Sequence, residues 1–310
     1  MFCEEWTFIV GCDIIKKTES VSRLRKCIWN REGKDLLMLK VTVLSENTGC
    51  EKCPGEHGLS LYIENEGHRI LLDAGQSPLF AENAEALGIA LEDVDIAVLS
   101  HAHYDHADGF ATFFEENNKA MLYVREEAGE CFYSLHEAGL KYIGPKQGML
   151  HENKDRIVYV KEDFYPLTDT DMFLVPHDTK ALSAIGEKAK LYQKVNGELL
   201  ADDFAHEQTL VAETETGLVI FNSCSHAGPA NVLADVMRVR KDEPIYAYIG
   251  GFHLSKYPDE DVYAFAEALQ QLQIGRIITG HCTGERALEI LQEKLGDRVE
   301  AMHAGMEIIL

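Results

Sequence analysis

The chain has too few basic residues and too short apolar runs for several classes of protein. Its 310 residues include 29 Lys and Arg against 52 Asp and Glu, a formal net charge of −23. Nucleic-acid backbones and anionic membrane surfaces are bound by clustered Lys and Arg. No stretch reaches the roughly 18–20 apolar residues of a membrane span. We therefore expect neither a nucleic acid nor a membrane as partner.

Cysteines are also sparse, eight in the whole chain, without the density of a disulfide framework. The N-terminus lacks the basic start of a secretory signal and has Glu4 and Glu5 in its place. Both observations predict reduced thiols in the cytoplasm. A hydrophobic content of 46% excludes intrinsic disorder.

Residues 1–37 differ in charge from the remainder. They contain seven Lys and Arg and six Asp and Glu, so almost all of the negative charge lies in 38–310. Strand-like alternation begins immediately afterwards, at Met38. We interpret 1–37 as a dispensable leader, rather than a partner-binding or targeting extension, and 38–310 as the folded domain.

Short apolar segments broken by turn residues predict strands, and apolar residues every three or four positions predict helices. The expected strands are 39–44, 59–64, 69–73, 95–99, 121–124, 208–213, 217–222, 245–249, 274–279, 299–302 and 306–310. The expected helices are 77–87, 109–117, 125–131, 229–239, 259–272 and 284–295. Residues 176–207 are polar and weakly periodic, which predicts a long loop or lid.

The strongest chemical signal is HAHYDH, which directly follows a predicted strand. Four of its six residues are types that bind metals. At a strand end, His101 and His103 can point to one metal, and Asp105 and His106 to a second one a few ångströms away. Imidazole and carboxylate ligands suit Zn²⁺, with Fe²⁺ or Mn²⁺ as alternatives. A polar surface loop rich in histidine is the less favoured interpretation.

Three later histidines, His226, His253 and His281, also follow predicted apolar strands. This position is the rim of a sheet, where sites form in α/β folds. One such histidine is usually structural and hydrogen-bonded. Three of them, in a chain that also contains HAHYDH, predict the completion of a two-metal site.

HAHYDH has the H-x-H-x-D-H form of the metallo-β-lactamase superfamily, and LLDAG resembles the L-x-D-x-G turn of that superfamily. The resemblance runs from about Met38 to Leu310. It implies an α/β fold, the metallo-β-lactamase αββα sandwich, with two packed sheets, helices outside and a dinuclear metal site at the sheet edge. It also implies that Asp73 supports the ligand loop.

The segments around the late histidines narrow the resemblance. CSHAG, GGFHL and GHCTG, together with ENT, EHGLSLYIE and LLDAGQSP, resemble the branch that includes 7,8-dihydropterin-6-methyl-4-(β-D-ribofuranosyl)aminobenzene 5′-phosphate synthases. Ala102 and Asp108 replace glycines that are frequent in the branch, and GCEKC interrupts the loop after ENT. The resemblance therefore implies fold and metal more firmly than substrate.

Within this resemblance, two metals that share a water need only two of the late histidines, because Zn²⁺ usually keeps about four ligands with one position open. GGFHL has no equivalent in the general ligand pattern of the superfamily, so we expect His253 to contact substrate or a developing oxyanion. Asp105 would bind metal, orient the water and take up its proton. The expected metal ligands are His101, His103, Asp105, His106, His226 and His281, and the expected catalytic residues are Asp105 and His253.

These residues predict a metal-dependent hydrolase or transferase with two Zn²⁺ ions. We expect a small, anionic, phosphate-bearing substrate such as a pterin or related heterocycle. Predicted helix starts at Pro229 and Gly284, the latter with Thr283 as N-cap, suit a phosphate. The alternative is an iron-loaded redox or oxygen-handling protein on the same fold. A catalytically silent ligand sensor is disfavoured by the intact HAHYDH.

Four cysteines lie in or near these motifs. Cys50 and Cys53 have the spacing of a redox pair or of half a second metal site. No second Cys-x-x-Cys exists, so we expect neither role. Cys224 and Cys282 lie inside histidine motifs, and we interpret them as small buried residues rather than as thiols that support the metal ligands.

Overall fold

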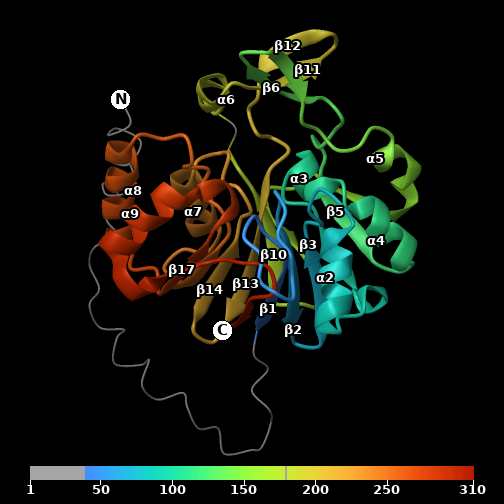
Figure 1. Ribbon diagram of the computed structural model, residues 1–310, viewed down its shortest axis with the longest axis horizontal. Helices are drawn as coiled ribbons and strands as arrows, with labels where there is room; N and C mark the ends of the chain where they lie inside the picture. The colour runs from blue at the N-terminus through green and yellow to red at the C-terminus, as the bar shows by residue number, and fades with distance from the viewer. Residues whose placement is uncertain (1–38, 179) are drawn as a thin grey trace, which may run out of the picture.

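A computed structural model describes residues 39–178 and 180–310. In these ranges two seven-stranded sheets pack face to face, and helices cover their outer faces (Figure 1). The predicted αββα sandwich is therefore confirmed. The expectation for residues 1–37 lies outside the described residues.

The first sheet combines an antiparallel half with a parallel half. Its strand order is β18-β1-β2-β3-β4-β5-β8, and the pairs from β3 to β8 are parallel. The strands are β1 (Lys40–Ser45), β2 (Ser60–Asn65), β3 (His68–Leu72), β4 (Ile96–Val98), β5 (Met121–Arg125), β8 (Ile157–Val160) and β18 (Glu307–Ile309).

The second sheet repeats this plan, with the order β17-β16-β15-β14-β13-β10-β9 and parallel pairs from β14 to β17. The strands are β9 (Tyr165–Pro166), β10 (Met172–Pro176), β13 (Gln208–Thr214), β14 (Gly217–Phe221), β15 (Ile245–Ile249), β16 (Arg276–Thr279) and β17 (Val299–Ala301). Because parallel strands end at the same edge, each sheet brings several strand-to-loop turns to one place.

Strand alternation divides the core into three layers. In β3, Ile70 and Leu72 face the space between the sheets, where they join Val219 and Ile249 of the second sheet. Leu71 points outward, into the layer under the helices of the first sheet. Successive side chains of a strand point to opposite faces, so each strand buries apolar residues on both sides.

The helices carry apolar stripes toward the sheets. Those on the first sheet are α2 (Leu79–Leu87), α3 (Tyr104–Ala107), α4 (Phe110–Glu116) and α5 (Met149–Glu152), and those on the second are α7 (Pro229–Val239), α8 (Asp259–Gln271) and α9 (Glu285–Leu295). In α8, Val262, Phe265 and Leu269 are buried at spacings of three and four residues. Among the described residues, no helix is both long and apolar enough to cross a membrane.

A third, four-stranded sheet projects from the sandwich at the top of Figure 1. Its order is β12-β11-β6-β7, and α6 (Ser183–Ala189) lies beside it. The strands are β6 (Phe132–His136), β7 (Gly139–Tyr142), β11 (Leu191–Val195) and β12 (Glu198–Ala201). The prediction of a long loop over 176–207 is wrong, because this segment forms α6 and half of the third sheet.

A second secondary-structure prediction also fails. Residues 125–131 are not a helix: Arg125 ends β5 and a turn follows. The Arg125 guanidinium donates to the backbone oxygen of Glu162 at 3.3 Å and pairs with Glu127 at 3.1 Å. These contacts fix the chain at the strand end, and tertiary packing outweighs the helix propensity of the Glu- and Ala-rich sequence.

Candidate metal centre

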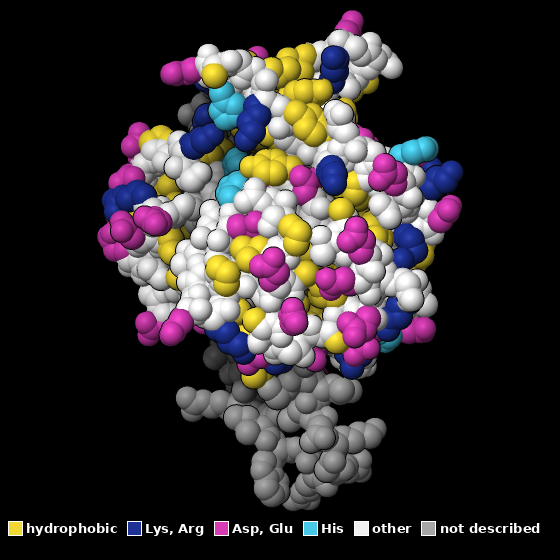
Figure 2. Space-filling view, turned by 45° about the vertical axis from the view of Figure 1, so that its right-hand side comes forward, with side chains coloured by type: hydrophobic (Ala, Val, Ile, Leu, Met, Phe, Trp, Pro, Cys, Tyr) yellow, Lys and Arg dark blue, Asp and Glu magenta, His cyan; other side chains and the backbone are white. Residues whose placement is uncertain are grey.

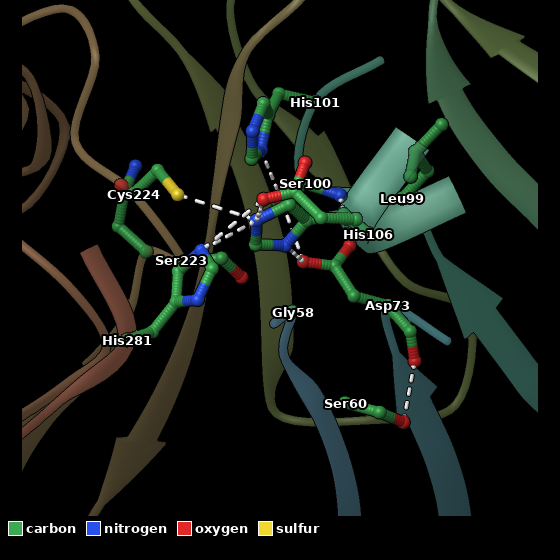
Figure 3. A network of polar contacts seen from close by, with 12 residues as sticks. Gly58, Ser60, Asp73, Leu99, Ser100, His101, His106, Ser223, Cys224 and His281 are labelled. Atoms are coloured by element: carbon green, nitrogen blue, oxygen red, sulfur yellow. Dashed lines mark hydrogen bonds and ion pairs between the residues drawn. The ribbon is translucent and has the colours of Figure 1, made fainter. Parts of the chain in front are cut away.

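The candidate site lies where the carboxyl ends of the parallel strands of both sheets meet. Asp73 directly follows β3, and HAHYDH runs from the turn after β4 into α3. From the second sheet, His226 follows β14 and His281 begins the short 3₁₀ helix after β16. Figure 3 shows His106 between Asp73 on one side and Cys224 and His281 on the other.

The first candidate cluster consists of His101, His103 and His226. One ligand atom from each residue lies within 4.8 Å of the others. The ring centroids are 4.7–4.8 Å apart, and all three side chains are buried. Burial, helped by neighbouring imidazoles, holds the pKa values of His101 and His226 well below their usual range and lowers that of His103 to about 3. The rings are therefore neutral, as metal ligands must be.

Bare nitrogen atoms in this cluster fit a bound cation. His101 Nε2, His103 Nε2 and His226 Nδ1 are buried and have no hydrogen-bond partner in the described part of the chain. Unpartnered buried polar atoms are costly, and native proteins rarely retain several together. The other His101 nitrogen, Nδ1, lies 2.8 Å from Ser100 Oγ. A divalent ion is the kind of group that would satisfy all three bare nitrogens at once.

The second candidate cluster consists of Asp105, His106 and His281. The Nε2 atoms of the two histidines are 3.2 Å apart. Asp105 Oδ2 lies 3.7 Å from His106 Nε2 and 3.5 Å from His281 Nε2. The carboxylate and two imidazole nitrogens thus converge on one small volume.

The partners of the two histidines fix which nitrogen carries the proton. His106 Nδ1 lies 2.7 Å from Asp73 Oδ2, and an ionised carboxylate can only accept, so Nδ1 donates and Nε2 is the nitrogen that faces the cluster. His281 Nδ1 donates in the same way to Asn47 Oδ1 at 2.9 Å. Two Nε2 atoms 3.2 Å apart beside a carboxylate need positive charge between them, which either a proton or a bound ion supplies. This cluster therefore also fits a cation.

In the metal-free protein a proton on His281 supplies this positive charge, which a bound ion would replace. Burial disfavours the charged form of His281, but the hydrogen bond and charge of Asp105 outweigh burial and raise the pKa of His281 to about 9. Burial acts on Asp105 too, yet His106, His281 and His57 hold its pKa well below its usual range. The carboxylate is thus ionised, and the cluster attracts positive charge.

Asp73 supports both clusters, as the family resemblance implies. Besides His106, it accepts the N–H of Ser100 at 2.7 Å and the Ser100 hydroxyl at 2.6 Å. Ser100 Oγ in turn lies beside His101 Nδ1. Asp73 has a φ of +59°, a conformation that a short polar side chain tolerates.

The sequence analysis gave no role to Glu46 and Asn47, although both lie in ENT, one of the segments that carry the family resemblance. Glu46 accepts the N–H groups of His281 and Thr48. Asn47 orients the His281 ring through Oδ1 and donates from Nδ2 to the His281 backbone oxygen at 3.3 Å. The ENT segment is the sequence signal that could have identified them.

Sequence reasoning also missed His57, within EHGLSLYIE. His57 Nε2 lies 3.2 Å from Asp105 Oδ2, and the side chain is 51% exposed. Its ring is 5.0 Å from that of His281. His57 therefore links the buried Asp105 carboxylate to solvent.

Three more residues near the ligands lie within the segment predicted as a lid. His206 Nδ1 accepts the N–H of Ala102 at 3.0 Å, and His206 Nε2 lies 3.2 Å from Asp202 Oδ2. The carboxylate of Glu207 accepts the N–H groups of His226 and Ala227, each at 2.8 Å. No motif in the sequence marks these residues, because the backbone groups that His206 and Glu207 bind lie outside their own segment.

His253 lies beside the first cluster but in a different group of candidate ligands, with Cys224 and Cys282. Its ring centroid is 4.3 Å from that of His226, and its Nδ1 is buried without a partner in the described chain. Cys224 Sγ is 3.2 Å from His106 Nε2, and the His253 N–H donates to Cys282 Sγ at 3.3 Å. Both thiols are buried as expected. Cys224 also contacts a candidate ligand, His106, which its interpretation as a small buried residue did not include, whereas Cys282 contacts the backbone of His253.

The two predicted helix starts are close to those observed. α7 begins at Pro229, and α9 begins at Glu285 with Gly284 as its N-cap. Thr283 is not the cap. Its Oγ1 accepts the N–H of Phe252 at 3.0 Å and lies 2.6 Å from Thr279 Oγ1, so it ties the His281 turn to the His253 turn.

The structure has a metallo-β-lactamase fold. Two sheets face each other with helices outside, and a turn rich in histidine and aspartate lies at their shared edge. The family model of the metallo-β-lactamase superfamily matches residues 53–186. The structure has the fold of this superfamily, and that fold implies that the chain binds divalent metal.

Particular relatives extend the similarity over most of the chain. It is 28% identical to the 7,8-dihydropterin-6-methyl-4-(β-D-ribofuranosyl)-aminobenzene-5′-phosphate synthase of Methanocaldococcus jannaschii, over 86% of this chain and 95% of that protein. The crystal structure of Tm1679, a metal-dependent hydrolase of the β-lactamase superfamily, is similar with a TM-score of 0.74 and 29% identity, covering 87% of this chain and 98% of Tm1679. Unliganded yeast PDE1 shares the fold, with a TM-score of 0.53 and 12% identity over 89% of this chain and all of that one.

Proposed function

We propose that the protein is a hydrolase or transferase that uses two divalent metal ions, zinc by preference, on a phosphate-bearing small molecule such as a pterin or related heterocycle. One observation carries the proposal: two clusters of candidate ligand atoms adjoin each other in one buried site. The ring centroids of His101, in the first cluster, and His106, in the second, are 4.2 Å apart.

The ligand chemistry supports this assignment. His101, His103 and His226 would hold one ion, and Asp105, His106 and His281 the other. Zn²⁺ favours imidazole and carboxylate ligands with one position open to water or substrate. Bound ions of this kind polarise the bond under attack and lower the pKa of water.

The chain itself supplies a route for protons. Asp105 is ionised and can accept a proton from a water or hydroxyl group in the site. His57 lies 3.2 Å from the same carboxylate oxygen and is half exposed, so it can carry that proton to solvent. Asp73 and Asn47 meanwhile bind Nδ1 of the His106 and His281 rings, so that Nε2 of each ring points toward the position of the ion.

A cavity beside HAHYDH supports an anionic substrate. It measures about 380 Å³, and two lysines, Lys141 and Lys146, line it together with one acidic residue, Asp108, and with Tyr104, the neighbour of Asp105. Lys141 Nζ lies 5.3 Å from the centre of the Tyr104 ring. Figure 2 shows Lys, Arg and His side chains gathered below the projecting third sheet, whereas Asp and Glu are frequent over the rest of this face.

A second hollow of the surface contrasts with this cavity. It measures about 440 Å³, lies against α2 and α4 away from the ligands, and is lined by glutamates such as Glu82 and Glu116. In a chain with a net charge of −23, the cavity with two lysines beside the metal ligands is the better place for a phosphate.

The relatives support both reaction types. One is named a synthase of a dihydropterin phosphate, and Tm1679 is described as a metal-dependent hydrolase. Hydrolysis and condensation differ in whether water or another nucleophile attacks the same polarised centre, so these ligands suit either.

Metal analysis and turnover assays test the proposal. Protein purified without added metal should contain about two zinc ions per chain and turn over phosphodiesters or dihydropterin phosphates. Lys141→Ala combined with Lys146→Ala should raise KM for a phosphate-bearing substrate more than it lowers kcat. Lys294→Ala, on the outer face of α9, is the matched control. Stoichiometric iron with visible absorbance and no turnover would instead favour the redox alternative.

A further inference from the structure

We propose that Cys50 and Cys53 form a redox-active dithiol, which closes to a disulfide by exchange with a low-molecular-weight disulfide. The pair lies in the loop between β1 and β2, outside both candidate metal clusters. The structure thus favours the redox interpretation that the sequence alone left aside. This inference is independent of the reaction at the metal centre.

The backbone holds the two cysteines at a distance that suits a disulfide. The N–H of Cys50 donates directly to the C=O of Cys53 at 2.7 Å. A direct backbone hydrogen bond between two residues keeps their Cα atoms close, which is compatible with the roughly 4.4–6.8 Å that disulfides require. The loop itself is closed by the N–H of Glu56, which donates to the C=O of Glu46 at 3.0 Å.

Gly305 shows that both sulfur atoms point the same way. A Cβ placed on Gly305 would lie 3.1 Å from Cys50 Sγ and 3.1 Å from Cys53 Sγ. Two atoms that close to one point are at most about 6 Å apart, and a χ1 rotation of the exposed cysteine can close such a gap. Gly305 has a φ of +84°, so its lack of a side chain serves both its turn and the space over the thiols.

The two thiols differ in the way that disulfide exchange requires. Cys50 is exposed and Cys53 is fully buried. Hydrogen bonds from the backbone of Cys53 and Lys52 lower the pKa of Cys50, whereas burial raises the pKa of Cys53. An exposed thiol with a lowered pKa is the attacking group in such pairs, and the buried thiol resolves the mixed disulfide.

A metal site is the weaker interpretation of the pair. Among the described residues, no grouping of candidate ligands includes Cys50 or Cys53. A structural zinc site needs about four ligands, and two thiols supply only half of them.

The reaction balances as an ordinary thiol–disulfide exchange. The Cys50 thiolate attacks one sulfur of the external disulfide and releases one equivalent of the small thiol, leaving a mixed disulfide on Cys50. Cys53 loses its proton and attacks Cys50 Sγ, which expels the second small thiol. The two cysteines are oxidised, and one molecule of the external disulfide is reduced to two thiols.

The test treats the full-length protein with glutathione disulfide as the probe and maps thiols by alkylation and mass spectrometry. We expect the wild type to form a disulfide between Cys50 and Cys53, seen as the loss of two hydrogens from the peptide that contains both. Cys53→Ser should stop at a glutathione adduct on Cys50. Cys50→Ser should leave Cys53 free, and Cys131→Ser should behave as wild type.

Two results would overturn the proposal. One is a wild-type protein in which Cys50 and Cys53 stay reduced while Cys131 reacts. The other is a Cys53→Ser protein that forms no adduct on Cys50. A measurement on the unaltered protein avoids any dependence on how the variants fold: alkylation of Cys50 should be faster at neutral pH than that of Cys131, whose pKa is raised by burial, and the reverse order would contradict the proposal.

Discussion

The two candidate metal clusters differ in the types of their ligands and in their access to solvent. His101, His103 and His226 are neutral, buried imidazoles whose bare nitrogens face one another. The other cluster contains the Asp105 carboxylate, and His57 links that carboxylate to solvent. The first arrangement suits the retention of an ion, and the second suits an ion next to which protons are exchanged.

The largest expected effect comes from removing two ligands of the first cluster. His101→Ala combined with His103→Ala leaves only His226 there, which cannot hold an ion alone. We expect the loss of about one metal ion per chain, of activity, and of most thermal stabilisation by zinc. Elemental analysis and melting curves measure this. His136→Ala, on an exposed part of β6, is the control, and unchanged metal content would refute the cluster.

The next largest effect distinguishes the role of His253 from that of the metal ligands in the first cluster. His253→Ala should keep metal content near wild type while turnover falls by roughly 10²–10⁴, as for the loss of an acid–base or charge-stabilising group. His226→Ala, in the neighbouring ring, should lose an ion. If His253→Ala loses a metal and His226→Ala retains both, the two assignments must be exchanged.

A smaller effect tests the support of the second cluster. Asp73→Asn keeps the size of the side chain but removes the charge that holds His106 Nδ1–H, and loss of such partners weakens metal binding by about 10–100-fold. Competition with a graded chelator should show one weakened ion. Asp95→Asn, whose carboxylate pairs with Lys119 near the surface, is the control. Equal chelator resistance in all three proteins would show that Asp73 does not act through the ligands.

A contrast between buried and exposed regions also bears on how much of the fold could be predicted from the sequence. The buried strands β14 and β16 were predicted to within two residues because each is a short apolar run between turn residues. Burial alone did not suffice, since β10 is buried along its whole length and was not predicted. The third sheet was missed because its strands are exposed on much of their surface. Leu135, Leu140 and Leu199 are 41%, 46% and 44% exposed, so hydrophobicity there does not follow the strand period.

For the site, too, only residues within local motifs could be predicted from the sequence. Residues of HAHYDH and the late histidines share local motifs, and the structure brings them together. Asn47 meets His281 across 234 positions, and Ala102 meets His206 across 104. Such contacts depend on the packing of two sheets, which neither spacing nor composition encodes. The metal ligands themselves stay a prediction until metal content is measured.

The smallest effect is on stability, and it has opposite signs in the two clusters of the metal-free protein. The pKa of His103 is about 3 in the folded protein, against an ordinary 6.5. Below 6.5 the unfolded chain binds a proton that the folded chain does not, so acidification from 6.5 toward 3 destabilises the fold. His281, with a pKa of about 9, stabilises the fold fully below 6.5 and loses this contribution as pH rises through 9.

Single substitutions should therefore flatten different sides of the pH profile of stability. Removing metal with a chelator and measuring urea unfolding on both sides of neutrality gives the profile. His103→Gln should reduce the loss of stability in acid and leave the alkaline side unchanged. His281→Gln should reduce the loss on the alkaline side and leave the acid side unchanged. If both variants kept the wild-type profile, the folded-state charges of the two clusters would not differ, and the separation into an ion-retaining and a proton-exchanging cluster would fail.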